Sequence, residues 1–327
     1  MHMEHSAPVL EIENLRTWFL TARGIGRAVD GVDLTLSGGE TLGVVGESGS
    51  GKTMLSLSVL GLVPRPGRIV GGAVRFKGLD LVRASDAELL KVRGNAISMI
   101  FQEPMTSLNP VFRVGEQIAE AVRLHRGLGK AEALERAREM LAKVGIPNPE
   151  RRLKSYPHEM SGGMRQRVVI AMALALDPDL ILADEPTTAL DVTIQAEILE
   201  LMRRLKEERR TAVMLITHDL GVVAQTCQRV AVMYAGKVVE EAPVLALFDE
   251  PLHPYTKLLL ASVPRIGERK PLAAIGGAVP NLMDLPRGCA FHPRCPDAVG
   301  FCSAEEPALL DLPDGRKVRC LLQATRT

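Results

Sequence analysis

The sequence has few aromatic residues, almost no net charge and no long apolar run. Aromatic residues make up 3% of the 327 residues, and 40 Lys and Arg offset 39 Asp and Glu to leave a charge of +1. Such a balance gives no overall electrostatic reason to bind nucleic acid or an anionic membrane surface. The longest apolar run, Val168 to Leu176, is far shorter than the about 20 residues that cross a bilayer.

The N-terminal residues also lack the apolar core of a secretory signal, so we expect a cytosolic protein whose membrane role, if any, comes through a partner. A chain of this length has room for about two domains, and 46% hydrophobic residues suffice for a core. Cysteine is scarce as well. In a cytosolic protein the five cysteines are not expected to form disulfides, yet four of them lie in the last 39 residues.

A glycine-rich stretch, Gly46 to Thr53, follows the pattern of Gly, four residues, Gly, Lys and then Ser or Thr. An apolar run predicts a buried strand before it, and the segment from Met54 to Leu60 predicts a helix after it. Glycines let the backbone close around a phosphate, and the N–H groups of a helix N-terminus attract one. Lys52 is placed to reach terminal phosphates, and the Thr53 hydroxyl to hold magnesium.

Two carboxylates follow a second apolar run. Leu180 to Ala183 predicts a central parallel strand, and it ends in Asp184 and Glu185. Open α/β sheets bind ligands at the carboxyl ends of their strands. Facing a phosphate loop, the first carboxylate is suited to holding magnesium and the second to taking a proton from water. Another buried strand, 212–217, delivers His218 to the same edge of the sheet.

The other segments predict the remaining architecture. Alternating residues at 9–15 and 29–36 predict an antiparallel sheet, with Trp18 and Phe19 between the two strands. Either ring could stack on a base or fill the core. Lys130 to Val144 predicts an amphipathic helix within an inserted helical block. Residues 195–209 predict a further helix, and 230–240 a closing hairpin.

A serine and two glycines, Ser161 to Gly163, precede the helix that begins near Val168. Such a segment makes an N-terminal anion site, but a plain glycine turn with a serine cap would look the same. Taken together, the ordered motifs of residues 8–248 closely resemble the ATP-binding cassette (ABC) family of transporter ATPases. Within that family, Met164-Arg165-Gln166-Arg167 and Asn109-Pro110 resemble the peptide-importer branch.

The resemblance implies the fold and the role of each residue. It implies a P-loop NTPase of the α/β class, with a mostly parallel RecA-like sheet, an antiparallel β subdomain and a helical subdomain at about 104–178. Residues 1–248 would form the ATP-binding domain and 249–327 a small C-terminal domain. The implied catalytic residues are Glu185 as base, His218 as switch histidine and Gln102; those binding ATP are Phe19, Gly46, Ser48, Gly49, Ser50, Gly51, Lys52, Thr53, Ser161, Gly162, Gly163, Asp184 and Asp191; those holding Mg²⁺ are Thr53, Gln102 and Asp184.

The resemblance also implies partners. In this family the signature segment of one subunit closes on the phosphate loop of another, so the chain must pair to work. It implies a second, related ATPase subunit, two membrane permeases and an extracytoplasmic substrate-binding protein, with the chain at the cytoplasmic face of the plasma membrane and no nucleic acid bound. Hydrolysis would then depend on positioning and charge neutralisation.

The C-terminal residues 249–327 are rich in proline and predict a compact, loop-rich appendage. A small segment buries little surface, so a metal could stabilise it. Four thiolates can hold tetrahedral zinc or an iron–sulfur cluster, and the Cys-two-residues-Cys knuckle typical of zinc is missing. Resemblance to the peptide-importer ATPases favours a [4Fe–4S] cluster, with zinc or free thiols as the alternatives. The expected ligands are Cys289, Cys295, Cys302 and Cys320.

Several functions stay open from the sequence. Import of di- or oligopeptides is favoured, and nickel or oligosaccharide import by the same branch is the alternative. A non-transport ABC ATPase acting on DNA or ribosomes would need long coiled coils or a second cassette, which the sequence lacks. A P-loop kinase would not need the segment around Ser161.

Overall fold

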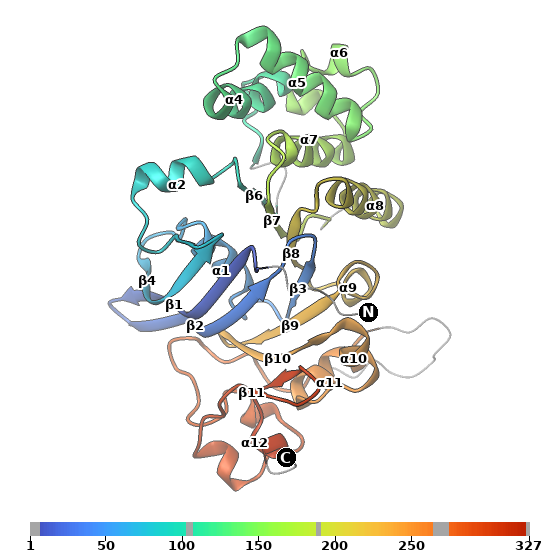
Figure 1. Cartoon of the computed structure of the whole chain (residues 1–327). Helices are drawn as coiled ribbons and strands as arrows, with labels where there is room; N and C mark the ends of the chain where they lie inside the picture. Colours follow the sequence, from blue (N-terminus) through green and yellow to red (C-terminus); the bar gives the residue numbers. More distant parts are fainter. Residues whose placement is uncertain (1–6, 103–106, 188–190, 264–274, 325–327) are drawn as a thin grey trace. The chain divides into compact units, whose positions relative to one another are not determined.

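The computed structural model describes residues 7–102, 107–187, 191–263 and 275–324. Contacts divide the chain into two compact units, each assembled from separate stretches of sequence (Figure 1). Unit 1 contains Met1–Val9, Ser37–Glu40 and Arg83–Leu215, and unit 2 contains Leu10–Leu36, Thr41–Val82 and Ile216–Thr327. Each unit is described below by itself.

The sheet of unit 1 is parallel and buried. Strand β6 (Ile97–Ile100) pairs in parallel with β7 (Leu180–Asp184), and β8 (Ala212–Ile216) follows β7 in the strand order. All five residues of β7 are buried, which confirms the central strand that its apolar run predicts. Helix α2 (Asp86–Val92) comes before β6 and begins at a capping box made by Ser85 and Glu88.

The helices of unit 1 between β6 and β7 form the inserted helical block. The amphipathic pattern at Lys130 to Val144 is confirmed as helix α5, which buries Ala133, Ala137, Met140 and Leu141 on one face. Of the predicted helical subdomain, 104–106 lie outside the described residues. The helices of this block are α4 (Val114–Arg126), α5 (Lys130–Lys143), α6 (Pro149–Arg152), the 3₁₀ turn η1 (Pro157–Glu159) and α7 (Gly162–Leu174), whereas α8 (Val192–Arg209) follows β7 and lies outside it.

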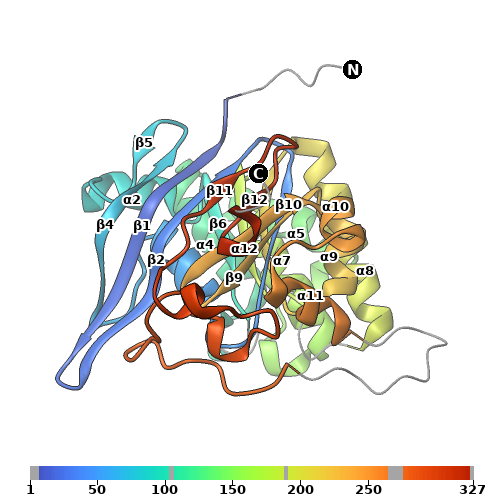
Figure 2. The same ribbon diagram turned by 90° about the horizontal axis from the view of Figure 1, so that it is seen from below.

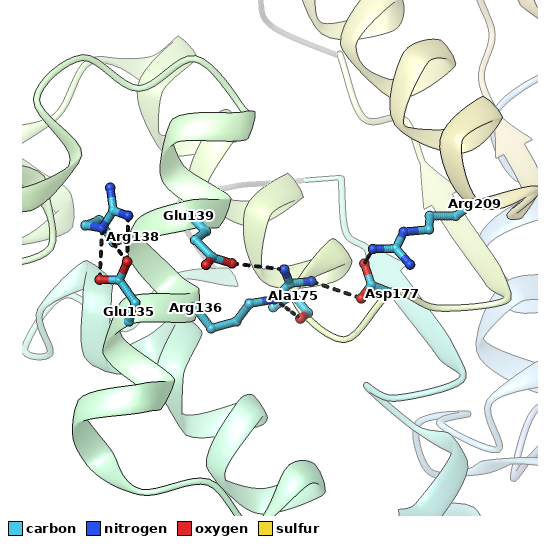
Figure 3. Close-up of polar contacts among 7 residues, drawn as sticks. All are labelled: Glu135, Arg136, Arg138, Glu139, Ala175, Asp177 and Arg209. Atoms are coloured by element: carbon cyan, nitrogen blue, oxygen red, sulfur yellow. Dashed lines mark hydrogen bonds and ion pairs between the residues drawn. The ribbon is translucent and has the colours of Figure 1, made fainter.

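Ion pairs tie α5 and α8 to the turn that follows α7 (Figure 3). The Arg136 guanidinium of α5 donates from Nε to the Ala175 carbonyl at 3.0 Å and from Nη2 to the Asp177 carboxylate at 3.0 Å. Arg209, the last residue of α8, pairs with the other Asp177 oxygen at 3.6 Å. Asp177 therefore receives a cation from each of two helices, directly before β7.

The first sheet of unit 2 is antiparallel, in the order β2-β1-β4-β5. The two alternating segments predicted to pair do so, but the strands are longer than expected. As a result, Trp18 and Phe19 lie within β1 and not between the strands, which corrects the prediction. The strands are β1 (Leu10–Thr21), β2 (Gly24–Leu36), β4 (Gly67–Phe76) and β5 (Leu79–Asp80).

The second sheet of unit 2 contains the strand before the glycine-rich loop. Strand β3 (Thr41–Val45) pairs in parallel with β9 (Arg229–Tyr234), which forms the predicted hairpin with β10 (Lys237–Pro243). Helix α1 (Lys52–Val59) follows β3, and α9 (Leu220–Thr226) follows β8. The C-terminal elements are α10 (Val244–Asp249), α11 (Pro254–Ala261), η2 (His292–Arg294), η3 (Gly300–Ser303), β11 (Leu310–Asp311), β12 (Lys317–Val318) and α12 (Leu321–Ala324).

The C-terminal segment packs onto the strands of unit 2 (red in Figure 2). Strand β12 pairs with β10 and so extends its sheet, and the Arg27 N–H of β2 donates to the Leu282 carbonyl at 3.2 Å. Between these contacts the segment is mostly loop and short turns, as its prolines predict. A domain boundary at residue 248 stays a prediction. Across the described ranges, no helix is long and apolar enough to cross a membrane.

Candidate functional site

The glycine-rich loop of unit 2 has the context that its sequence predicts. Strand β3 ends at Val45, and α1 begins at Lys52, so residues 46–51 connect a buried strand to the N-terminus of a helix. Ser48 and Gly49 are exposed at the tip of the loop, while Ser50 is buried. The N–H groups of the first helical turn and the helix dipole favour an anion at this end of α1.

Two glycines let the loop lie directly against neighbouring backbone. Gly46 has φ +150°, and a Cβ there would lie 2.2 Å from the Met233 carbonyl oxygen. Gly51 has φ +102°, and its Cβ would lie 2.1 Å from the Ala28 carbonyl oxygen. No side chain fits at either position, so β9 and β2 fix the two ends of the loop.

The Lys52 side chain, 7% exposed, lies along the inner side of this loop. Its ammonium donates to the carbonyls of Gly46 at 2.7 Å and Glu47 at 2.9 Å. The dipoles of these two carbonyls help to stabilise the ammonium in its buried position. The loop therefore presents a positive centre, which suits the binding of an anion.

Two further predicted site residues belong to unit 2. Phe19 is half-buried on β1, and its ring lies against Gly67 of β4, where a Cβ would approach Phe19 Cζ to 2.8 Å. One ring surface is thus used in packing, and stacking on a base stays a prediction. His218 is exposed and lies two residues after the end of β8. The next residue, Asp219, caps α9 by accepting from the Gly221 and Val222 N–H groups.

Unit 1 brings three predicted residues together at the ends of two adjacent strands. Asp184 ends β7 and is 2% exposed. Glu185 follows with φ +48°, a left-handed conformation that is uncommon for a residue with a Cβ and that recurs at functional sites. Gln102 lies after β6, and its amide donates to Glu185 Oε2 at 3.0 Å. Parallel pairing of β6 and β7 explains why residues 83 positions apart meet.

The segment Ser161 to Gly163 begins helix α7. Ser161 is the N-cap, and its hydroxyl accepts from the Met164 N–H at 3.3 Å. At Gly162 a Cβ would meet open space, whereas at Gly163 it would lie 3.1 Å from Ile194 of α8. The exposed start of this 13-residue helix fits both the anion-site and the capped-turn interpretations.

Two side chains hold the start of α7 and of α8 in place. Gln166, which is 1% exposed, donates from its amide to the Pro186 carbonyl, directly after Glu185. Asp191 is the N-cap of α8, and its carboxylate accepts from the Ile194 N–H at 2.9 Å. Gln166 thus links the serine–glycine helix to the segment carrying the two carboxylates.

The expectation of a [4Fe–4S] cluster, with zinc as the alternative, is wrong. In the described ranges, which include all five cysteines, no group of three or more His, Cys, Asp or Glu is arranged to hold a metal, and none of the cysteines forms a disulfide. Burial raises the pKa values of the Cys289, Cys295 and Cys320 thiols, which disfavours the thiolates that bind metal. The four C-terminal cysteines do line one cavity, but its volume is about 20 Å³, room for one water and not for a cluster.

Sequence reasoning missed the residues that hold the glycine-rich loop from the C-terminal segment. Arg294 pairs with the Glu47 carboxylate at 2.8 Å, and the Tyr255 hydroxyl accepts from the Glu47 N–H at 2.8 Å. No local pattern marks either contact, because the partners are 247 and 208 residues apart.

Comparison with known proteins agrees with this arrangement. The profile described as "ABC transporter" matches residues 29–188, and the one described as "Oligopeptide/dipeptide transporter, C-terminal region" matches residues 239–302. The oligopeptide transport ATP-binding protein AppD of Bacillus subtilis is 54% identical over 96% of this chain and 96% of its own length. The dipeptide transport ATP-binding protein DppD of Escherichia coli is 49% identical over 95% and 96%.

A solved structure shows the same fold. A dimeric ATP-binding cassette in a post-hydrolysis state, bound to ADP and Pi, superposes with a TM-score of 0.65 at 31% identity and covers 72% of this chain and 98% of its own. With relatives this similar over nearly the whole length, the chain belongs to the ABC transporter family of ATP-binding proteins. It is an ABC ATPase with the P-loop NTPase fold of the α/β class.

Proposed function

We propose that this chain is the ATP-hydrolysing subunit of a bacterial peptide importer. The observation that carries the proposal is the loop at 46–53, in which neighbouring carbonyls leave no room for a side chain at Gly46 and Gly51 and whose lysine is buried and turned inward. Relatives at 49–55% identity named as peptide, oligopeptide or dipeptide transport ATP-binding proteins support peptides as the cargo. The profile match at 239–302 supports the same branch.

In this proposal the loop binds the phosphates of ATP. The exposed N–H groups of Ser48 and Gly49, with those at the start of α1, would cradle the β-phosphate. Lys52 would exchange its bonds to the Gly46 and Glu47 carbonyls for phosphate oxygens, which are better partners for an ammonium. Phe19 would stack on the adenine, and His218 would contact the terminal phosphate. The remaining loop residues proposed to contact phosphate are Gly46, Ser50, Gly51 and Thr53.

Magnesium fits the donor set. Thr53 offers an exposed hydroxyl, Gln102 an amide oxygen and Asp184 a buried carboxylate, all oxygen donors of the kind that Mg²⁺ prefers. When bound, Mg²⁺ neutralises charge on the phosphates. Glu185 would accept the proton of the attacking water, and the Gln102 amide would hold the carboxylate in place through its hydrogen bond.

The partners follow from the motifs in this chain. It carries one glycine-rich loop and one serine–glycine segment, so we propose that Ser161, Gly162, Gly163 and Asp191 act on a nucleotide bound to a second, related ATPase subunit. Two membrane permeases and an extracytoplasmic peptide-binding protein would complete the importer, with this chain at the cytoplasmic face of the plasma membrane. The named relatives support this assembly.

Reconstitution tests the proposal. The full chain, co-expressed with the permeases and ATPase encoded beside it, is purified from detergent-solubilised membranes and placed in proteoliposomes with labelled oligopeptides. We expect ATP-dependent peptide accumulation that is lost in Lys52→Ala. ATP hydrolysis without peptide uptake, but with uptake of nickel or a sugar, would reassign the cargo. Recovery of the chain only with ribosomes or DNA would overturn the transport role.

A further inference from the structure

The C-terminal segment reaches the glycine-rich loop through one loop residue, Glu47. All three of its polar groups are engaged: its carbonyl accepts from the Lys52 ammonium, its N–H donates to the Tyr255 hydroxyl, and its carboxylate accepts from Arg294. Two of these three partners lie within residues 239–302, outside the stretch that matches the ABC transporter profile. All these residues belong to unit 2.

The pairing of Arg294 with Glu47 is bidentate. Nη1 donates to Oε2 at 2.8 Å, and Nη2 donates to Oε1 at 3.0 Å. The Arg294 side chain is 4% exposed and that of Glu47 24%, so water screens the pair weakly. A bidentate guanidinium–carboxylate pair that is this well buried fixes the orientation of the Glu47 carboxylate as well as its distance from Arg294.

Arg294 is itself held rigidly. Its Nε donates to the Gly276 carbonyl at 2.8 Å, and its guanidinium lies 5.9 Å from the centre of the Tyr234 ring. It is also the last residue of η2. These contacts hold the guanidinium on the side of the C-terminal segment, from which it pairs with Glu47 of the loop.

An aromatic cluster positions the second contact. The Tyr255 ring is fully buried and lies 4.7 Å from Tyr234 and 5.3 Å from Phe291, centre to centre. Burial raises the pKa of Tyr255, so the hydroxyl stays protonated and accepts the Glu47 N–H as a neutral group. The Glu47 backbone and side chain are thus held on one side by the C-terminal segment.

We propose that Arg294 is a positioning residue for nucleotide binding, acting through Glu47. The proposal rests on the function proposed above, in which Lys52 binds phosphate. Glu47 places a carboxylate one residue from Gly46, beside a site for a highly charged anion. Arg294 neutralises that carboxylate and holds it, with its backbone carbonyl, in the orientation that keeps Lys52 inside the loop.

The first experiment measures the affinity of the full chain for Mg·ADP by calorimetry. Arg294→Met leaves the Glu47 carboxylate without its cation, and we expect the Kd to rise about tenfold, the effect of losing one charge-assisted pair. Arg294→Lys keeps the positive charge but cannot form the bidentate pair, so we expect its Kd to lie between those of wild type and Arg294→Met. Arg316→Met is the control, because Arg316 contacts Asp314 and the Glu250 carbonyl and does not contact the loop.

A double variant separates neutralisation of the Glu47 carboxylate from a role of Arg294 in folding. Removing the charge with Glu47→Gln in the Arg294→Met background should bring the Kd back to within about threefold of wild type, because the repulsion is gone. A merely structural arginine would lower the melting temperature in both variants, with no recovery of affinity. That result, or an unchanged Kd in both Arg294→Met and Arg294→Lys, would overturn the inference. Tight binding by Lys52→Ala would instead overturn the proposed function.

Discussion

The Gln102 amide and the Glu185 carboxylate meet across 3.0 Å, where two parallel strands end side by side. A neutral donor of this kind holds a carboxylate without supplying a countercharge. Glu185 is also in a left-handed backbone conformation, so its side chain leaves the strand at an angle that ordinary extended backbone would not give. Both features position the group that we propose as proton acceptor.

Replacing this carboxylate should separate nucleotide binding from hydrolysis. In Glu185→Gln the carboxamide has a similar shape but cannot accept the proton from water, so we expect phosphate release by the assembled complex to fall by about 10²- to 10⁴-fold. Affinity for ATP should be retained, and a closed pair of ATPase subunits should accumulate. Phosphate release and size-exclusion profiles measure the two effects. Glu208→Gln on the exposed side of α8 is the matched control, and turnover equal to wild type in Glu185→Gln would contradict the assigned role.

The glycines of the loop differ in what a methyl group would meet. Gly51→Ala drives a Cβ into the Ala28 carbonyl at 2.1 Å, whereas at Gly49 nothing lies within 4 Å although φ is also positive. We expect Gly49→Ala to cost about 1 kcal/mol of unfolding free energy and Gly51→Ala about 1–3 kcal/mol more. Urea unfolding of the two variants checks the difference. Equal unfolding free energies for the two variants would show that the backbone at Ala28 can shift to accommodate the methyl group.

The arginines of α5 provide a second matched pair. Arg136 joins α5 to Ala175 and Asp177, while Arg138 pairs with Glu135 of the same helix (Figure 3). Arg136→Met removes tertiary contacts and should cost about 1–3 kcal/mol of unfolding free energy. Arg138→Met removes solvent-exposed ion pairs with Glu135 and, at 3.5 Å, with Glu150 of α6, and should leave the melting temperature almost unchanged. A larger loss in Arg138→Met would contradict this ranking.

Buried His253 should make stability depend on pH. Its Nδ1 accepts from the Tyr255 N–H at the start of α11, and burial lowers its pKa from 6.5 to about 3. Since the unfolded chain binds this proton more readily, the stability is complete above pH 6.5 and is lost as the pH falls toward 3, by up to about 1.4 kcal/mol per unit.

Neighbouring Glu240 works in the opposite sense, because burial raises its pKa and the folded state then gains stability as that carboxyl protonates. The variant His253→Asn keeps an acceptor for the cap and removes the titration. We expect its urea midpoint to fall less steeply than that of wild type between pH 6.5 and 4.5. If the urea midpoints of the two proteins fell equally steeply with pH, His253 would be ruled out as the source of the pH dependence.

Strong local patterns predicted the elements that carry the site. Strand β3 and the helix after it follow from an apolar run and the glycine spacing, and β7 follows from the apolar run Leu180 to Ala183, all of which is buried. Strand β4 and helix α2 were not predicted. In β4, Gly67, Gly71 and Gly72 interrupt the alternation of apolar and polar residues that would predict a strand. At Gly67 a larger residue would not fit, because the Phe19 ring occupies the space of a Cβ. For α2, Ser85 and Glu88 gave a capping-box signal that could have located its start.

Contacts between distant residues could not be read from the sequence. The Arg294–Glu47 pair depends on how the C-terminal segment returns to the loop, and neither residue lies in a periodic pattern. For the cysteines, the sequence predicted a site that the structure does not contain in the described residues. Their clustering in sequence predicted a metal centre, but burial that favours neutral thiols and a cavity with room for one water argue against it.

The carboxylate of Asp177 has a mechanical consequence. Arg136 and Arg209 both pair with it, and Arg136 also binds the carbonyl of Ala175 at the end of α7. Helix α7 therefore cannot swing about its C-terminal end without pulling on α5 and α8 together. A displacement of α7 at its C-terminal end would therefore act on these contacts with α5 and α8, three residues before β7, the strand that ends in Asp184.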